Sequence, residues 1–122
     1  MHYHGEKQED IINRVGGNMV IELHNRTPDD KLADTEVEVS LDGVKRRVPA
    51  GTRLVLKPGE SITLTPYLYH EFWAEPGKGM AVVGEVSAVN DDNTDNYFLE
   101  PRGRFPEIEE DCKPVHLLRT EY

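Results

Sequence analysis

Apolar and polar residues alternate along much of the chain, with turn residues at short intervals. Val37, Val39 and Leu41 alternate with polar positions, and the pair Asp42-Gly43 follows directly. Side chains of a strand point to opposite faces in turn, and Asp-Gly between two such runs is a strong signal for a two-residue hairpin. We therefore predict a hairpin whose strands are 37–41 and 44–48.

Further short strands are expected at roughly ten-residue spacing. Turn signals occur at Pro49-Ala50-Gly51, at 57–60 and at 76–79. The runs between and around these turns are 20–23, 52–56, 61–65 and 80–89. Helix is expected only as short turns near Glu6–Ile11 and Pro106–Asp111, where acidic residues cluster. This pattern predicts an all-β sandwich or barrel.

Composition restricts the class of protein. The chain of 122 residues is long enough for a single domain, 1–122, with one core. Its net charge of −9 disfavours nucleic acid and anionic membrane partners. Cys112 is the single cysteine, so an intrachain disulfide is impossible. Because no apolar stretch is long enough for a signal peptide core or a membrane span, we expect a cytoplasmic protein.

Four side chains are candidate metal ligands. His2 and His4 are separated by one residue, Glu9 follows five positions later, and His70 comes after the turn at Pro66. On a strand, residues two apart lie on one face, so both imidazoles can reach the same point. Three neutral imidazoles and one carboxylate suit a borderline divalent metal and leave coordination positions open, which is typical of catalytic sites.

The spacing of these residues resembles the two cupin motifs. Residues 2–16 read as an HxH pair, four residues, a glutamate, six residues and a glycine, which is similar to the first motif. Residues 59–70 resemble the second, with a glycine, a strand, a proline turn and a final histidine. The resemblance implies a small jelly-roll β-barrel of the cupin type, with the metal held inside by His2, His4, Glu9 and His70.

Segments outside the motifs resemble the D-lyxose isomerase family. These are cupin-fold sugar isomerases that interconvert D-lyxose with D-xylulose and often accept D-mannose, whose ketose is D-fructose. Members carry a sizeable segment before the HxH pair, whereas here the histidines stand at positions 2 and 4. The matching segments are 9–14, 57–64, 72–75, 84–87, 89–96 and 104–106, and the acidic and amide run after Val89 is the most particular of them.

The resemblance implies a metal-dependent aldose-ketose isomerase, with Mn²⁺ the favoured ion and Zn²⁺, Co²⁺ or Fe²⁺ also compatible. Such a reaction needs a base over the carbon-bound hydrogen and a donor for the developing oxyanion. We expect Glu85 as the base, in phase with Val83 and Ser87, while Val82, Gly84, Val86 and Ala88 form an outer, core-facing row. Lys7 is the expected donor. Phe72, Asp92 and Arg104 are candidate contacts to the sugar.

Several alternatives stay open at this point, because a fold does not fix a reaction. Glu85 could be an outward strand carboxylate, Lys7 a solvated lysine and Phe72 a core residue. The chain could be a weakly active or non-catalytic metal-binding fragment, or an Fe²⁺ dioxygenase with the same ligands. A phosphosugar isomerase would need a basic cluster, for which 45–47 is the candidate. Residues 91–96 are expected as a hydrogen-bonded loop at the barrel mouth, and a homodimer is the expected assembly.

Overall fold

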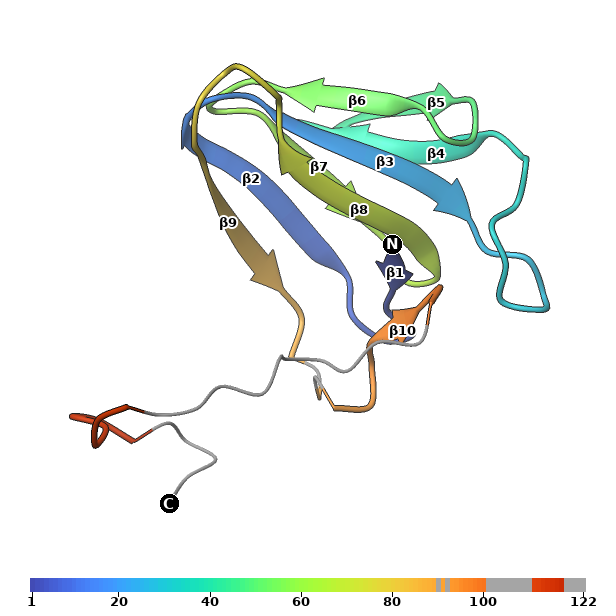
Figure 1. Ribbon diagram of the computed structural model, residues 1–122. Helices are drawn as coiled ribbons and strands as arrows, with labels where there is room; N and C mark the ends of the chain where they lie inside the picture. The colour runs from blue at the N-terminus through green and yellow to red at the C-terminus, as the bar shows by residue number, and fades with distance from the viewer. Residues whose placement is uncertain (90, 92, 101–110, 118–122) are drawn as a thin grey trace.

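Two antiparallel β-sheets pack face to face (Figure 1). The computed structural model describes residues 1–89, 91, 93–100 and 111–117. Each sheet has five strands among these residues. In order, the first sheet contains β10 (Tyr97–Phe98), β1 (His2–Tyr3), β8 (Leu68–Ala74), β3 (Met19–Asn25) and β6 (Arg53–Leu56), and the second contains β5 (Val44–Val48), β4 (Val37–Leu41), β7 (Ser61–Leu64), β2 (Glu9–Gly16) and β9 (Ala81–Ser87).

The all-β, cupin-type architecture expected from the sequence is confirmed. Strands β4 and β5 have the predicted bounds, and Leu41 pairs with Val44 across the two-residue turn. Asp42 and Gly43 both have positive φ, 47° and 77°. Two consecutive left-handed residues give the turn that matches the twist of the flanking strands. The strands expected at 20–23, 52–56, 61–65 and 80–89 are β3, β6, β7 and β9.

The core lies between the sheets and receives alternate residues from both. Strand β3 contributes Met19, Ile21 and Leu23, all fully buried, and β2 and β7 contribute Ile11 and Ile62 from the opposite sheet. This strand alternation buries one face of each sheet. The remaining buried members of the cluster are Val37, Val39, Leu56, Leu64 and Leu68.

Strand β1 is only two residues long, yet it is paired on both sides. His2 pairs with His70 of β8 and with Phe98 of β10. The amino group of Met1 also lies 3.1 Å from Glu71 Oε2. In Figure 1, β1 lies beside β8 and β10. Backbone pairing of this kind fixes a segment that would otherwise fray.

The helical turn predicted over Glu6–Ile11 is wrong. Residues 5–8 form a bend and an extended connection, and β2 begins at Glu9. The amides of this connection bond to a distant carboxylate, that of Asp95, so they are not available to a helical turn. The second expected turn, Pro106–Asp111, lies outside the described residues except for Asp111. Among the residues that the structure describes, no helix is long and apolar enough to cross a membrane.

The orientation predicted for the small apolar row of β9 is also wrong. Val82 and Val86 are 49% and 62% exposed, whereas Val83 packs against the core. The reason is that Val82 and Val86 are on the face of β9 opposite to Val83, which is the face turned away from the core between the two sheets. Glu85 pairs with Ile11, a core residue, so the Glu85 face of β9 is the one turned toward the opposite sheet.

Candidate metal centre

The three predicted histidine ligands converge on one point. His2 is in β1, His4 is the first residue after that strand, and His70 is the third residue of β8. One ring nitrogen from each lies within 4.8 Å of the other two. His4 and His70 are 4% and 2% exposed. The fold therefore brings His70 to His2 and His4, as the sequence predicted, although it lies more than 60 positions further along the chain.

Glu9 lies beside His4 and His70 but belongs to the opposite sheet. It is the first residue of β2, and its side chain shares the inward face of that strand with Ile11. Its Oε1 lies 3.0 Å from His70 Nε2 and 3.6 Å from His4 Nε2. The carboxylate thus adds an oxygen donor beside two of the three imidazole nitrogens.

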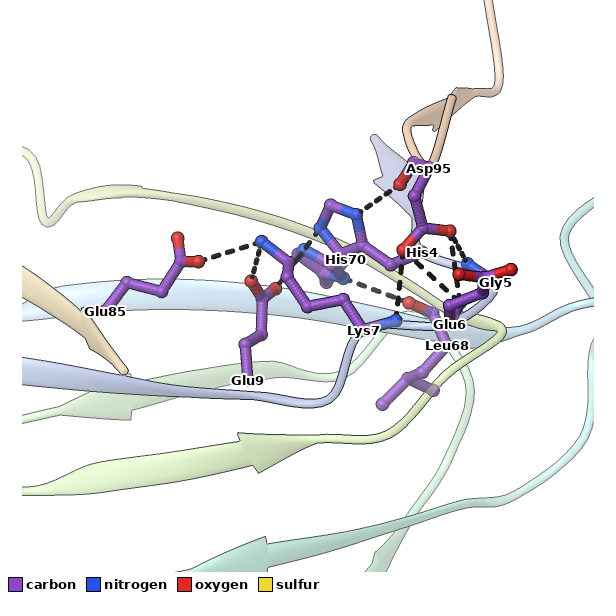
Figure 2. A network of polar contacts seen from close by, with 9 residues as sticks. All are labelled: His4, Gly5, Glu6, Lys7, Glu9, Leu68, His70, Glu85 and Asp95. Atoms are coloured by element: carbon purple, nitrogen blue, oxygen red, sulfur yellow. Dashed lines mark hydrogen bonds and ion pairs between the residues drawn. The ribbon is translucent and has the colours of Figure 1, made fainter. Parts of the chain in front are cut away.

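Backbone carbonyls fix the tautomers of two imidazoles. His4 Nδ1 lies 2.7 Å from the carbonyl oxygen of Asp95, and His70 Nδ1 lies 3.0 Å from that of Leu68 (Figure 2). A carbonyl oxygen can only accept, so in the neutral rings the proton is on Nδ1. Both Nε2 atoms then face the Glu9 carboxylate, where a proton or a metal ion can bind them. This is the arrangement that metal-binding histidines usually have.

The electrostatics of the site favour neutral His2 and ionised Glu9. Burial, helped by the neighbouring His70 and His4, lowers the pKa of His2 to about 3. Burial alone would raise the pKa of Glu9, but hydrogen bonds from His4, His70 and Lys7 outweigh it and lower that pKa. A deprotonated carboxylate and neutral imidazoles are the forms that bind a metal.

Glu9 has the opposite effect on His4. Burial would lower the pKa of His4, but the hydrogen bonds to Glu9 and to the Asp95 carbonyl together raise it. A proton is thus attracted to the space between His4 and Glu9. The residues fit a divalent cation at this place, because such a cation would replace the proton and satisfy the carboxylate. The donor types are compatible with several first-row metals and do not choose among them.

Lys7 links the ligand group to Glu85. Its Nζ lies 2.7 Å from Glu9 Oε2 and 2.8 Å from Glu85 Oε1 (Figure 2). Lys7 is 6% exposed, so it is not a solvated lysine. Burial would lower the pKa of Lys7, but its hydrogen bonds to Glu85 and Glu9 raise it. The ammonium therefore stays charged, and the Glu85 carboxylate is held beside the group of ligands.

Of the three predicted contacts to the sugar, the structure describes only Phe72. Phe72 is opposite Ile21 on β3 and in phase with His70, yet it is 41% exposed. Phe72 is therefore an accessible aromatic side chain on the face of β8 that carries His70, and it is not a core residue. Asp92 and Arg104 lie outside the described residues.

The basic residues at 45–47 lie away from the centre. They are on β5, which is separated from β2 by β4 and β7. Three strand spacings amount to about 14 Å. Lys45 and Arg47 both contact Glu38 on the neighbouring strand. The phosphate site that a phosphosugar isomerase would need is therefore not supported by this cluster.

Asp95 is a residue of the site that the sequence did not reveal. Its side chain is 5% exposed and bonds to the backbone next to His4. The expected hydrogen-bonded loop is present around it, since the amides of Thr94 and Asp95 donate to the Asp91 carbonyl. The acidic run pointed to a polar loop, but no spacing rule distinguishes Asp95 from its neighbours.

Comparison with known proteins gives matches over the entire chain. A family model described as D-lyxose isomerase matches residues 1–122. A protein of Serratia proteamaculans named D-lyxose/D-mannose isomerase is 58% identical over 122 residues, and one of the same name from Escherichia coli O157:H7 is 51% identical. Each match covers 100% of this chain and 54% of the relative. The chain thus spans about half the length of these curated relatives.

A third relative matches a shorter part of the chain. It is a protein of Thermosediminibacter oceani, again named D-lyxose/D-mannose isomerase, and it is 43% identical over 56 residues. That match covers 45% of this chain and 29% of the relative.

Proposed function

The chain belongs to the D-lyxose isomerase family, and we propose that it is a metal-dependent aldose-ketose isomerase that interconverts D-lyxose and D-xylulose. D-mannose and D-fructose form the second proposed pair. The observation that carries the proposal is the position of the His4 and His70 Nε2 atoms against Glu9, with Lys7 joining that group to Glu85. The names of the relatives supply D-lyxose and D-mannose, and D-xylulose and D-fructose are the corresponding ketoses.

The proposed metal ligands are His2, His4, Glu9 and His70, with Mn²⁺ the favoured ion. When bound, the cation supplies a Lewis acid that polarises the sugar carbonyl and stabilises negative charge on its oxygen. The four side chains would hold the ion with neutral nitrogens and one carboxylate oxygen.

Glu85 is the proposed base. Its carboxylate takes the proton from carbon 2 of the open-chain aldose, and the electron pair of that C–H bond forms the double bond between carbons 1 and 2. O1 receives a proton from the Lys7 ammonium in this step, giving a cis-enediol. Glu85 then returns its proton to carbon 1 while O2 gives its proton to the neutral Lys7 amine and becomes the ketone oxygen, so both side chains end as they began. A positioned base of this kind contributes roughly 10²- to 10⁴-fold in rate.

Lys7 and Phe72 have supporting roles in this proposal. The Lys7 ammonium lies between Glu9 and Glu85, so it can donate to the sugar oxygen on which negative charge develops. Phe72, exposed on the same face as His70, packs against the carbon face of the sugar. Asp92 and Arg104 stay candidate hydroxyl contacts. A homodimer and a cytoplasmic location also stay predictions.

The test is an isomerase assay in D₂O with a metal analysis of the same preparation. We expect D-xylulose from D-lyxose, loss of the product after chelation, recovery on adding Mn²⁺, and deuterium at carbon 1 of the ketose. Bound metal without ketose formation would contradict the isomerase proposal and favour the non-catalytic, metal-binding fragment. Oxygen consumption with a small organic substrate, and no ketose, would favour the Fe²⁺ dioxygenase alternative.

A further inference from the structure

The carboxylate of Asp95 collects the backbone amides that follow His4. Its Oδ1 accepts from the amide of Gly5 at 2.6 Å and from that of Glu6 at 3.1 Å. Its Oδ2 accepts from the amide of Lys7 at 3.0 Å and makes a second, longer contact of 3.3 Å with that of Glu6. Three consecutive amides pointing at one buried carboxylate form an anion-binding nest, here filled by a side chain of the same protein.

Asp95 also holds the ring of His4, through its main chain. Its carbonyl oxygen is the acceptor for His4 Nδ1 at 2.7 Å. One residue therefore sets two things at once, namely the path of the backbone between His4 and Glu9 and the rotation and tautomer of the His4 imidazole. Figure 2 shows both sets of contacts on the same side of His4.

The segment that carries Asp95 is closely packed on β1. The rings of Tyr97 and Tyr3 stack with centroids 4.7 Å apart and planes 5° apart. Gly5 leaves little room, since a Cβ there would lie 3.3 Å from Asp95 Oδ1 and 3.4 Å from the Tyr97 ring. A small displacement of Asp95 would therefore be passed directly to the residues beside His4.

We propose that Asp95 is a positioning residue for the metal centre, fixing His4 and the 5–7 connection so that His4 Nε2 and Glu9 face the same ion. This inference rests on the proposed metal site but not on the identity of the sugar. Asp95 also positions the backbone of Lys7, because the Lys7 amide is one of the three that donate to its carboxylate.

The first test measures the Zn²⁺ and Mn²⁺ dissociation constants of the full chain by competition with a chromophoric chelator. Asp95→Ala removes every side-chain acceptor, and we expect metal binding 10- to 100-fold weaker, as for other outer partners of metal ligands. Asp95→Asn keeps one acceptor oxygen but turns an amide donor toward the backbone N–H groups, so we expect a smaller loss. The matched control is Asp91→Asn, on the same segment, where the side chain accepts from the Asn93 amide.

The second test separates positioning from general support of the fold. Long-range ¹H–¹⁵N NMR spectra of the metal-free protein, recorded at a pH where His4 is neutral, report which His4 nitrogen carries the proton. We expect Nδ1–H in the parent and in Asp91→Asn, and a mixture of tautomers in Asp95→Ala. If Asp95→Ala does not fold, the same spectrum and titration are made on Asp95→Asn.

The outcomes distinguish this inference from the proposed function. Metal affinities of folded Asp95 variants within twofold of the parent, or an unchanged His4 tautomer, would overturn the role of Asp95 and leave the isomerase proposal intact. A parent that binds metal but forms no ketose, with affinity lost in Asp95→Ala, would overturn the isomerase proposal and support the role of Asp95.

Discussion

Lys7 and Glu85, 78 positions apart in the sequence, are joined by a hydrogen bond of 2.8 Å from the ammonium to the carboxylate. The same ammonium contacts Glu9 at 2.7 Å. One cation therefore connects a proposed metal ligand with the proposed base, and the two carboxylates stay close without direct repulsion. The roles of Lys7, Glu85 and Glu9 can therefore be tested one at a time.

The Glu85→Gln variant should keep its metal and lose turnover. Glutamine preserves the size of the side chain but cannot accept the carbon-bound proton, so we expect kcat to fall by about 10²- to 10⁴-fold. Glu36→Gln, an exposed site, is the control and should match the parent. Near-normal turnover in Glu85→Gln would remove Glu85 from the role of base.

The Lys7→Met variant should also keep its metal, with a fall in kcat of roughly 10². Methionine retains the aliphatic bulk but removes the donor to the developing oxyanion. Steady-state kinetics with a metal analysis check this, and Lys57→Met, at an exposed position, is the control. A rise in KM with kcat unchanged would mean that Lys7 serves only in ground-state binding.

Phe72→Ala should weaken sugar binding more than it weakens the fold. The ring is 41% exposed, so its truncation leaves a smaller cavity than the loss of a buried aromatic side chain. We expect a raised KM for D-lyxose and a melting temperature within a few degrees of the parent, with Phe72→Leu intermediate. A large loss of stability with KM unchanged would identify Phe72 as a packing residue.

The metal-free protein should lose stability as the pH falls from about 6.5 toward 3. Burial, with His70 and His4 nearby, lowers the pKa of His2 from 6.5 to about 3. Between these values the unfolded chain binds a proton that the folded chain does not, so the free energy of unfolding rises with pH. The contribution of His2 is complete above pH 6.5.

Urea unfolding in EDTA at several pH values measures this effect. We expect the His2→Gln variant to give a shallower decline than the parent over the same range, because glutamine does not titrate. Parallel curves for the two proteins would contradict a neutral, partly buried His2.

The strands could be predicted because their signals are local. Alternation and the pair Asp42-Gly43 fix the 37–48 hairpin without help from the rest of the chain. The four candidate ligands could be selected from their motif spacing, and the fold brings the three histidines together with Glu9 beside two of them. The wrong predictions concern segments whose conformation depends on contacts with distant parts of the chain. Glu6–Ile11 reads as a helical start, but the amides of 5–7 bond to Asp95, about 90 positions away.

The orientation of β9 illustrates the same limit. Val82 and Val86 are apolar, and apolar residues usually face a core. Their exposure follows from the register of β9 against β2, which sets the inward face and is not a property of residues 81–87 alone. That register places Glu85 opposite Ile11, on the same face as Val83.

The convergence of His2, His4, His70 and Glu9 on one ion is tested most directly by metal stoichiometry. After loading with Mn²⁺ or Zn²⁺ and extensive dialysis, elemental analysis of the parent should give one ion per chain. Glu9→Ala, which removes the carboxylate that contacts both His4 and His70, should give none. An ion retained at parental affinity in folded Glu9→Ala, or no ion in the parent, would contradict the site.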